Sequence, residues 1–139
     1  LRLCIRRPKR RIYVMGDSLL VRQSLINLIQ NALRYTLQGG VLVAIRPRGD
    51  ECMVEVWDTG VGIADEEKGK IFSPYYRPEL AWKIDSAGHG LGLAVVARCA
   101  KLMKVKYGMQ SIEGKGSRFW MRFTQYAGED SALDIPPAA

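Results

Sequence analysis

Apolar residues in two parts of the chain recur every three or four positions, the spacing that lines one face of an α-helix. The first stretch covers residues 18–36, where Asp17 or Ser18 is suited to cap the first turn. The second begins at Gly90 and continues to about Lys104. The spacing therefore predicts two helices, well separated along the chain.

Two other parts of the chain carry short apolar runs divided by turn residues, a pattern typical of paired strands. Residues 41–47 and 52–58 flank the turn RGDE at 48–51. Residues 107–114 and 117–123 flank a second, glycine-containing turn. The short connections predict an antiparallel pair in each case.

The chain begins with two segments of alternating apolar and polar residues, 1–7 and 10–16, around the turn signal Pro8-Lys9. This alternation predicts a hairpin or two edge strands. A cluster of cations surrounds the turn: Arg6, Arg7, Lys9, Arg10 and Arg11. We interpret the cluster as a solvated turn, with a phosphate-binding patch as the alternative.

The pattern is less regular between the first strand pair and the second helix. Residues 65–72 predict a short helix whose acidic start suits the positive end of a helix dipole. Residues 73–88 contain two prolines and no sustained period, which predicts a long loop. Residues 126–139 are expected to form a disordered tail, so that residues 1–125 make up the folded domain.

Composition narrows the class of protein. The 139 residues are about one domain's worth of chain, and 47% apolar with 25% charged residues is ordinary for a globular protein. No apolar run approaches the roughly 20 residues that a membrane-spanning helix needs. Cys4, Cys52 and Cys99 lack disulfide or zinc spacing, which favours a reducing, cytoplasmic setting. Because the chain starts at Leu1, we expect a fragment of a longer protein.

The formal charge of +7 invites an anionic partner such as nucleic acid, a membrane surface or a phosphorylated ligand. Lysines and arginines are spread along the sequence and form no recognition-helix or zinc-finger signature. A basic nucleic-acid-binding domain is therefore kept only as a minor alternative.

The first helix carries a polar stripe. Gln23, Asn27, Asn31 and Arg34 share one face of an otherwise apolar element. A solvated helix face would explain the stripe, but Asn is a poor choice for such a face because its amide competes for backbone hydrogen bonds. The two asparagines are therefore candidate binding residues.

The second predicted strand ends at Asp58. If Val54 and Val56 face the core, Asp58 places a carboxylate at the end of an apolar face, where it needs hydrogen-bond donors. Gly60 and Gly62 would let the backbone approach a ligand closely. An ordinary Asp-x-Gly turn after a strand is the alternative.

Three glycines precede the second helix, at Gly88, Gly90 and Gly92. Amide groups at a helix N-terminus form a natural phosphate site when side chains are absent. The stretch is not a P-loop, because no Lys-Ser or Lys-Thr follows, and it lacks the dinucleotide-binding spacing.

Taken in order, these motifs resemble the ATP-binding catalytic domain of sensor histidine kinases, a member of the Bergerat-fold superfamily that also holds gyrase-type ATPases. The similar stretches run from about Gly16 to Phe123: NLIQNALRYT, DTGVGI, IFSPYYR, GHGLGL and GKGSRF. The resemblance implies an α+β fold in two layers, with a mixed, mostly antiparallel sheet of about five strands packed on three helices and an ATP lid.

The resemblance also implies residue roles. Asn31 would hold Mg²⁺, a hard ion that needs few protein ligands, and Asn27 would face the same triphosphate. Asp58 would accept the exocyclic amine of adenine, with Gly60 and Gly62 beside the base. Four further side chains would approach the phosphates: Arg34, Tyr35, Arg77 and Lys83. The remaining implied nucleotide contacts are Ile63, Gly88, His89, Gly90, Leu91, Gly92 and Leu93.

Hydrolytic branches of the superfamily carry a glutamate four residues before the magnesium asparagine, where this chain has Asn27. We therefore expect a phosphoryl donor and a poor hydrolase. The only histidine, His89, lies in a glycine box and is interpreted as a lid residue. The implied partners are ATP, a dimerisation domain that bears the phosphorylated histidine, and the receiver domain of a response regulator. The implied parent is a dimer, either membrane-anchored or not, with this domain in the cytoplasm.

Two stretches depart from the family pattern. His89 stands where the family often has threonine or glycine, and residues 101–109 lack the usual glycine-rich turn after the last helix. These departures weaken the inferences about lid contacts and leave Asn31 and Asp58 unaffected. The main alternative function is a degenerate nucleotide-binding domain that serves as an interaction module.

Overall fold

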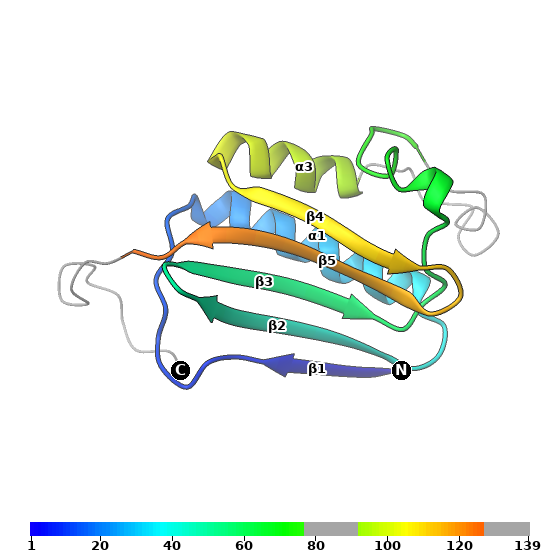
Figure 1. Ribbon diagram of the computed structural model, residues 1–139, viewed down its shortest axis with the longest axis horizontal. Helices are drawn as coiled ribbons and strands as arrows, with labels where there is room; N and C mark the ends of the chain where they lie inside the picture. Colours follow the sequence, from blue (N-terminus) through cyan, green and yellow to red (C-terminus); the bar gives the residue numbers. More distant parts are fainter. Residues whose placement is uncertain (77–91, 127–139) are drawn as a thin grey trace.

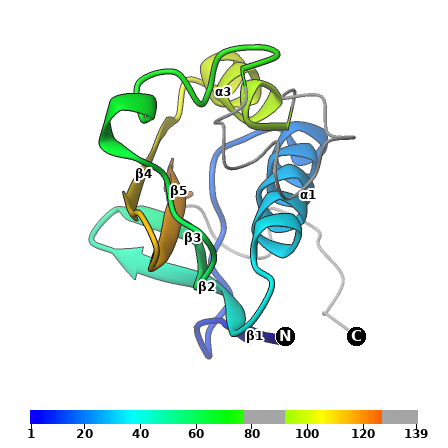
Figure 2. The same ribbon diagram turned by 90° about the vertical axis from the view of Figure 1, so that its right-hand side faces the viewer.

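A computed structural model describes residues 1–76 and 92–126. It shows one five-stranded sheet in the order β1-β2-β3-β5-β4, with two α-helices on one side of it (Figure 1). Figure 2 shows the two layers edge-on, with α1 and α3 beside each other. The described elements are β1 (Arg2–Arg6), α1 (Ser18–Tyr35), β2 (Gly40–Arg48), β3 (Glu51–Asp58), the 3₁₀ helix η1 (Asp65–Glu67), α3 (Gly92–Met103), β4 (Lys106–Ile112) and β5 (Gly116–Thr124).

Both predicted helices are present, and the start of α1 has the cap that the sequence indicates. Asp17 has extended backbone, and its Oδ1 accepts hydrogen bonds from Leu19 N at 2.9 Å and Leu20 N at 3.1 Å. These bonds satisfy two of the amide groups that a helix leaves unpaired at its N-terminus.

Both predicted strand pairs are confirmed as antiparallel. Residues of β2 pair with β3, and residues of β4 pair with β5, while β3 and β5 join the two hairpins into one sheet. β1 adds a parallel edge strand, with Leu3 opposite Val41. The sheet is therefore mixed and mostly antiparallel, as predicted.

At the start of the chain the sequence predicts a hairpin or two edge strands: the hairpin is wrong, and an edge strand is confirmed for residues 2–6 only. Residues 2–6 form β1, but β1 pairs with β2 and not with residues 10–16. Backbone groups of that second segment find partners at the end of β5 instead: Met15 N donates to Thr124 O at 2.9 Å, and Val14 bridges Gln125. The alternation of residues predicted extended chain correctly but could not choose its partner.

The predicted helix at residues 65–72 forms only as the 3₁₀ helix η1 followed by turns. Its hydrogen bonds join residues three apart, as in Lys68 N to Asp65 O at 3.3 Å and Lys70 N to Glu67 O at 3.0 Å. Gly69 has a low helix propensity, and the segment is too short to hold an α-helix by itself.

The core lies between the sheet and the helices. Paired residues point to the same face, so alternate residues of β3 and β5 face α1 and α3. The fully buried members of this core come from every layer: Leu28 and Ala32 of α1, Val96 and Ala100 of α3, and Val41, Val56, Phe119, Met121 and Phe123 of the sheet. The predicted two-layer α+β class is confirmed.

No helix within residues 1–76 and 92–126 is both long and apolar enough to cross a bilayer. Residues 127–139, most of the predicted tail, lie outside the described residues, as does most of the predicted loop 73–88. The domain boundary at residue 125 therefore stays a prediction.

Candidate functional site

The two asparagines of α1 lie on the flank of the helix that meets α3. Asn27 is half-buried, and its Nδ2 donates to Gln23 O at 2.9 Å. A Cβ built on Gly92, the first residue of α3, would lie 3.7 Å from Asn27 Oδ1. The fold therefore brings the asparagine-rich motif against the last glycine of the GHGLGL motif, 65 positions later in the sequence.

Asn31 lies one helical turn beyond Asn27 and is also half-buried. Its side-chain amide makes no hydrogen bond to any residue in the described ranges. A neutral oxygen donor in this state can accept a ligand without first breaking a contact with those residues. Of the predicted stripe, Asn27 and Asn31 are half-buried, whereas Gln23 and Arg34 are exposed as on a solvated helix face.

Asp58 ends β3 on the face of the sheet that the helices cover, in register with Ser117 of β5. Its Oδ1 accepts a hydrogen bond from Gly60 N at 2.9 Å. Burial raises the pKa of the Asp58 carboxyl above its usual value, and the backbone amides of Gly60 and Ser117 oppose this rise. The carboxylate is half-buried, as its place after an apolar strand face predicts.

Gly60 is where β3's loop meets the end of α1. A Cβ built on Gly60 would lie 2.9 Å from Asp58 Oδ1 and 3.0 Å from Thr36 Oγ1, and it would collide with the Tyr35 carbonyl. Val61 N donates to that same carbonyl at 3.4 Å. Only a residue without a side chain lets the loop pass this close to the helix end.

Gly62 has φ +70°, in the left-handed region that favours glycine. A Cβ there would lie 2.8 Å from Glu113 Cα and would collide with the Ile112 carbonyl. The next residue, Ile63, packs against the core and donates its N–H to Ser111 Oγ at 2.8 Å. The loop is therefore fixed against α1 at one end and against β4 at the other.

Other predicted residues are less completely placed. Tyr35 is half-buried at the end of α1, Arg34 is exposed in its last turn, and Leu93 packs against the core from the first turn of α3. Six predicted contacts lie outside the described residues: Arg77, Lys83, Gly88, His89, Gly90 and Leu91.

An open cavity of about 580 Å³ borders the same loop, with Tyr35 and Gly60 among its lining residues. Neither Asn31 nor Asp58 lines it. The other described lining residues are Leu37, Gln38, Thr59, Val61, Glu113 and Gly114. The cavity thus overlaps the predicted site at Tyr35 and Gly60, while the two principal predicted residues lie outside its lining.

Three polar residues that the sequence reading did not select also support this region. Ser111 and Ser117 are buried, and their Oγ atoms lie 2.8 Å apart; the Ser111 hydroxyl donates to Gly116 O at 3.0 Å, which leaves Ser117 to donate in the serine pair. Thr36 is 3% exposed, and its Oγ1 has no hydrogen-bond partner in the described part of the chain. The register of the last strand pair could have indicated the serines, because the GKG turn places Ser111 opposite Ser117.

Comparison with known proteins identifies the family. Residues 16–127 match the family described as histidine kinase-, DNA gyrase B-, and HSP90-like ATPase. The chain belongs to this ATPase family. The resemblance inferred from the sequence motifs is confirmed, and the matched range includes every predicted site residue.

Relatives of this ATPase domain include several sensor kinases. It is 30% identical over 126 residues to the sensor histidine kinase RcsC of Escherichia coli K12, covering 91% of this chain and 13% of RcsC. It is 44% identical over 108 residues to the aerobic respiration control sensor protein ArcB of the same strain, covering 76% of this chain and 14% of ArcB. The chain therefore spans only a small part of the curated relatives it matches.

Solved structures give the same result for the fold of the domain. Full-length ShkA in complex with AMPPNP is similar with a TM-score of 0.75 at 28% identity, over 91% of this chain and 26% of ShkA. The catalytic domain of the histidine kinase ThkA, in a nucleotide-free form, is similar with a TM-score of 0.74 at 27% identity, over 88% and 78% of the two chains.

Proposed function

We propose that this chain is the catalytic domain of a sensor histidine kinase, which binds Mg-ATP and donates the γ-phosphoryl group to a histidine on a dimerisation domain outside the chain. One observation carries the proposal. The asparagine face of α1 meets the start of α3, while the end of the same helix meets the loop that follows Asp58. One helix thus joins the two motifs predicted to hold opposite ends of the nucleotide.

At the adenine end, Asp58 is proposed to accept the exocyclic amine of the base. Guanine has a carbonyl at that position, so the carboxylate selects adenine. The residues fit such a ligand: Asp58 uses Oδ1 for Gly60 N, and the hydroxyl of Thr36 beside them is buried without a partner among residues 1–76 and 92–126. Buried polar groups of this kind normally have a partner, which a ligand or its ordered water would supply.

At the phosphate end, Asn31 is proposed to hold Mg²⁺ through its amide oxygen. The residue fits because its amide has no competing hydrogen bond among the described residues. When bound, the ion supplies charge neutralisation for the phosphates. Arg34 and Tyr35 are proposed to approach the phosphates from the end of α1. The proposed roles of Arg77, Lys83 and residues 88–91 in the lid rest on their motifs alone.

Asn27 bears on how fast the domain hydrolyses ATP. An amide cannot take a proton from water, and the Nδ2 of Asn27 is already bonded to the Gln23 carbonyl. We therefore propose phosphoryl transfer by positioning and charge neutralisation, with slow hydrolysis. An ATPase assay should show much slower turnover than in a branch that carries the glutamate, and comparable turnover would contradict this part of the proposal.

Thermal unfolding with and without magnesium and the non-hydrolysable analogue AMPPNP tests the binding site. Saturation at 100 times the dissociation constant should add about 2.7 kcal/mol to the free energy of unfolding. Asn31→Ala and Asp58→Ala should each remove most of that gain. Two exposed residues provide matched controls, Gln30→Ala on the outer side of α1 and Asp50→Ala in the β2–β3 turn, and both should keep it.

The outcomes separate the alternatives. A gain that both site variants retain would mean that the site is misplaced. No gain in the parent chain, together with no heat in isothermal titration, would favour a degenerate interaction module. We further propose that the domain works in the cytoplasm and that its partners are the dimerisation domain of the same protein and a receiver domain.

A further inference from the structure

Seven of the 21 lysines and arginines, which are spread along the sequence, share one surface of the fold. This surface is the outer face of the sheet, the face turned away from α1 and α3 (Figure 1). Strand register assigns residues to it, because paired residues share a face. The outer face carries the cations Arg2, Arg6, Arg46, Arg48, Lys106, Arg118 and Arg122, against the carboxylates Glu51 and Glu55.

The centre of this outer face is built around a buried carboxylate. Glu55 is 0% exposed although no helix or strand in the described part of the chain covers this side of the sheet. Arg46 Nε lies 3.0 Å from its Oε1, and Arg118 Nε pairs with its Oε2. Met53 and Ala44, on the same face, are 3% and 4% exposed. Long arginine side chains therefore cover the sheet and are held in place by an ion pair.

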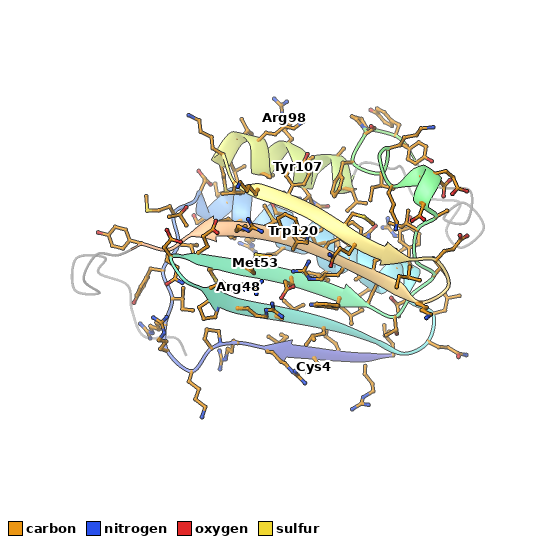
Figure 3. All side chains as sticks on the ribbon, viewed as in Figure 1. Cys4, Arg48, Met53, Arg98, Tyr107 and Trp120 are labelled. Carbon is orange, nitrogen blue, oxygen red and sulfur yellow. The ribbon has the colours of Figure 1, made fainter. Side chains whose placement is uncertain are left out.

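Two tryptophans lie among these arginines. The guanidinium of Arg118 lies over the Trp57 ring at 5.3 Å, and that of Arg122 lies over the Trp120 ring at 5.3 Å. Trp120 packs over the bare backbone of Gly108 on β4, where a Cβ would come within 3.0 Å of the indole. Figure 3 shows Trp120 in the same view of the sheet as Met53 and Arg48, on three successive strands.

A guanidinium stacked on an indole uses its flat face for that contact. The N–H groups of Arg122 make no hydrogen bond within the described residues and suit two parallel hydrogen bonds to a carboxylate, whereas Arg118 is 12% exposed and already donates to Glu55 and Gln110. Arg122 makes no ion pair within the described residues, and the side chain of Arg46 is 48% exposed. The centre of the face thus presents oriented donors that suit carboxylates.

The rim of the face carries further cations, Arg2 and Arg6 on β1, Arg48 at the end of β2 and Lys106 at the start of β4. All four are exposed, and none makes an ion pair with another residue in the ranges 1–76 and 92–126. Tryptophan and arginine are the residues most enriched in the energetically important centres of protein interfaces, and a charged rim speeds and orients association.

We propose that the outer face of the sheet is a docking surface for an acidic protein surface, separate from the nucleotide site on the helical side. The defined elements are the Trp–Arg centre (Trp57, Trp120, Arg118 and Arg122) and the cationic rim (Arg2, Arg6, Arg48 and Lys106). The inference does not depend on nucleotide binding, because the two sites lie on opposite faces of the sheet.

Other anionic partners fit this surface less well. Bases of single-stranded nucleic acid bind by stacking on free aromatic rings, but the rings of both tryptophans already stack with arginine. A bilayer needs several apolar groups that project together, and of the two tryptophans only Trp57, at 40%, is among the exposed large apolar side chains. Carboxylates on a protein need neither free rings nor projecting groups.

NMR titration of the full chain tests the proposal with a short peptide of alternating glutamate and serine, and with a glutamine–serine peptide of the same length. The glutamate peptide should shift the indole N–H signals of Trp57 and Trp120 and bind less tightly as salt rises. The glutamine peptide should produce neither effect. Replacing Arg48→Gln together with Lys106→Gln should weaken binding about fivefold, since this factor corresponds to about 0.5 kcal/mol for each of two exposed ion pairs.

The matched control is Arg98→Gln with Lys101→Gln on α3, which removes one arginine and one lysine from a different face. It should change affinity less than twofold. Arg122→Lys keeps the charge but loses the planar fork, and should also weaken binding. The proposal is overturned if the α3 control weakens binding equally or the shifts map away from both tryptophans. It is also overturned if the glutamate peptide does not bind, or if single-stranded DNA or anionic vesicles bind the face more tightly.

Discussion

The Asp58 carboxyl is held at the end of β3 in surroundings that favour its neutral form. Burial raises its pKa in the folded chain above the usual 3.8, so the folded state binds more protons than the unfolded state between those two pKa values. Stability from this group is therefore lost as the pH rises through the folded-state pKa. The ionised form destabilises the free domain at neutral pH.

Asp58→Asn should consequently raise the melting temperature of the nucleotide-free domain near pH 7. The gain should shrink as the pH falls and disappear below about pH 3.8, where the parent carboxyl is protonated in both states. The same change should weaken AMPPNP binding by about tenfold or more, because it removes a hydrogen bond to a charged group. Thermal melts across pH and isothermal titration measure the two effects.

Asp50→Asn is the control for this substitution, since Asp50 is exposed in the β2–β3 turn and should change neither quantity. A destabilised Asp58→Asn variant at neutral pH would show that the carboxylate stabilises the fold. An unchanged affinity would remove Asp58 from the proposed adenine contact.

Single residues also show how far a sequence could predict this site. Asp58 and Asn31 could be predicted from the sequence because each residue type is unusual at its position. Asp58 is a carboxylate at the end of an apolar strand, and Asn31 is an amide inside a helix. Thr36 could not be predicted, because threonine is ordinary at helix ends, and Ser111 could be found only through the predicted register that places it opposite Ser117. Their importance comes from tertiary contacts, such as the bond from Ile63 N to Ser111 Oγ, which no local pattern encodes.

At the scale of elements, prediction worked where one element's own periodicity decides its structure. α1, α3 and the two hairpins each have a buried face that repeats along the segment. It failed for residues 10–16, where the partner strand had to be chosen, and for residues 65–72, where tertiary contacts hold a series of turns. The gathering of cations on the outer face was likewise invisible, because it depends on strand order.

The loop between β3 and η1 is fixed by close backbone approach at two glycines, and this gives a second prediction. Gly62→Ala should destabilise the domain by about 3 kcal/mol, because it adds a collision with the Ile112 carbonyl to the strain of a positive φ. Gly114→Ala isolates the strain term, since Gly114 has φ +80° but nothing within 4 Å of a built Cβ. It should destabilise by only about 1 kcal/mol.

Urea unfolding measures both glycine variants, and AMPPNP titration adds a functional readout. Gly62→Ala should also weaken nucleotide binding, because the loop carries Gly60 and ends at Ile63. Equal destabilisation by the two variants would mean that the loop backbone can shift at Gly62 to accommodate the added side chain, and that the loop is not fixed against β4.

At the scale of the whole molecule, the chain is a domain with two proposed functional faces, and it spans a small share of its relatives' length. It covers 13% of RcsC and 14% of ArcB, and its only histidine is His89. Nucleotide is proposed to bind on the helical side of the sheet, and an acidic partner on the outer side. A histidine that receives the phosphoryl group must then reach the helical side without using the outer face.

This arrangement predicts that the 139-residue chain binds labelled Mg-ATP but does not label itself. Supplied with a histidine-bearing dimerisation domain fused ahead of Leu1, it should label that domain with the acid-labile, base-stable linkage of phosphohistidine. Asn31→Ala should abolish the label, whereas Arg48→Gln with Lys106→Gln should leave it unchanged, because those residues lie on the opposite face of the sheet. Label on the unfused chain that His89→Gln removes would contradict the prediction, since His89 would then be an acceptor and not a lid residue.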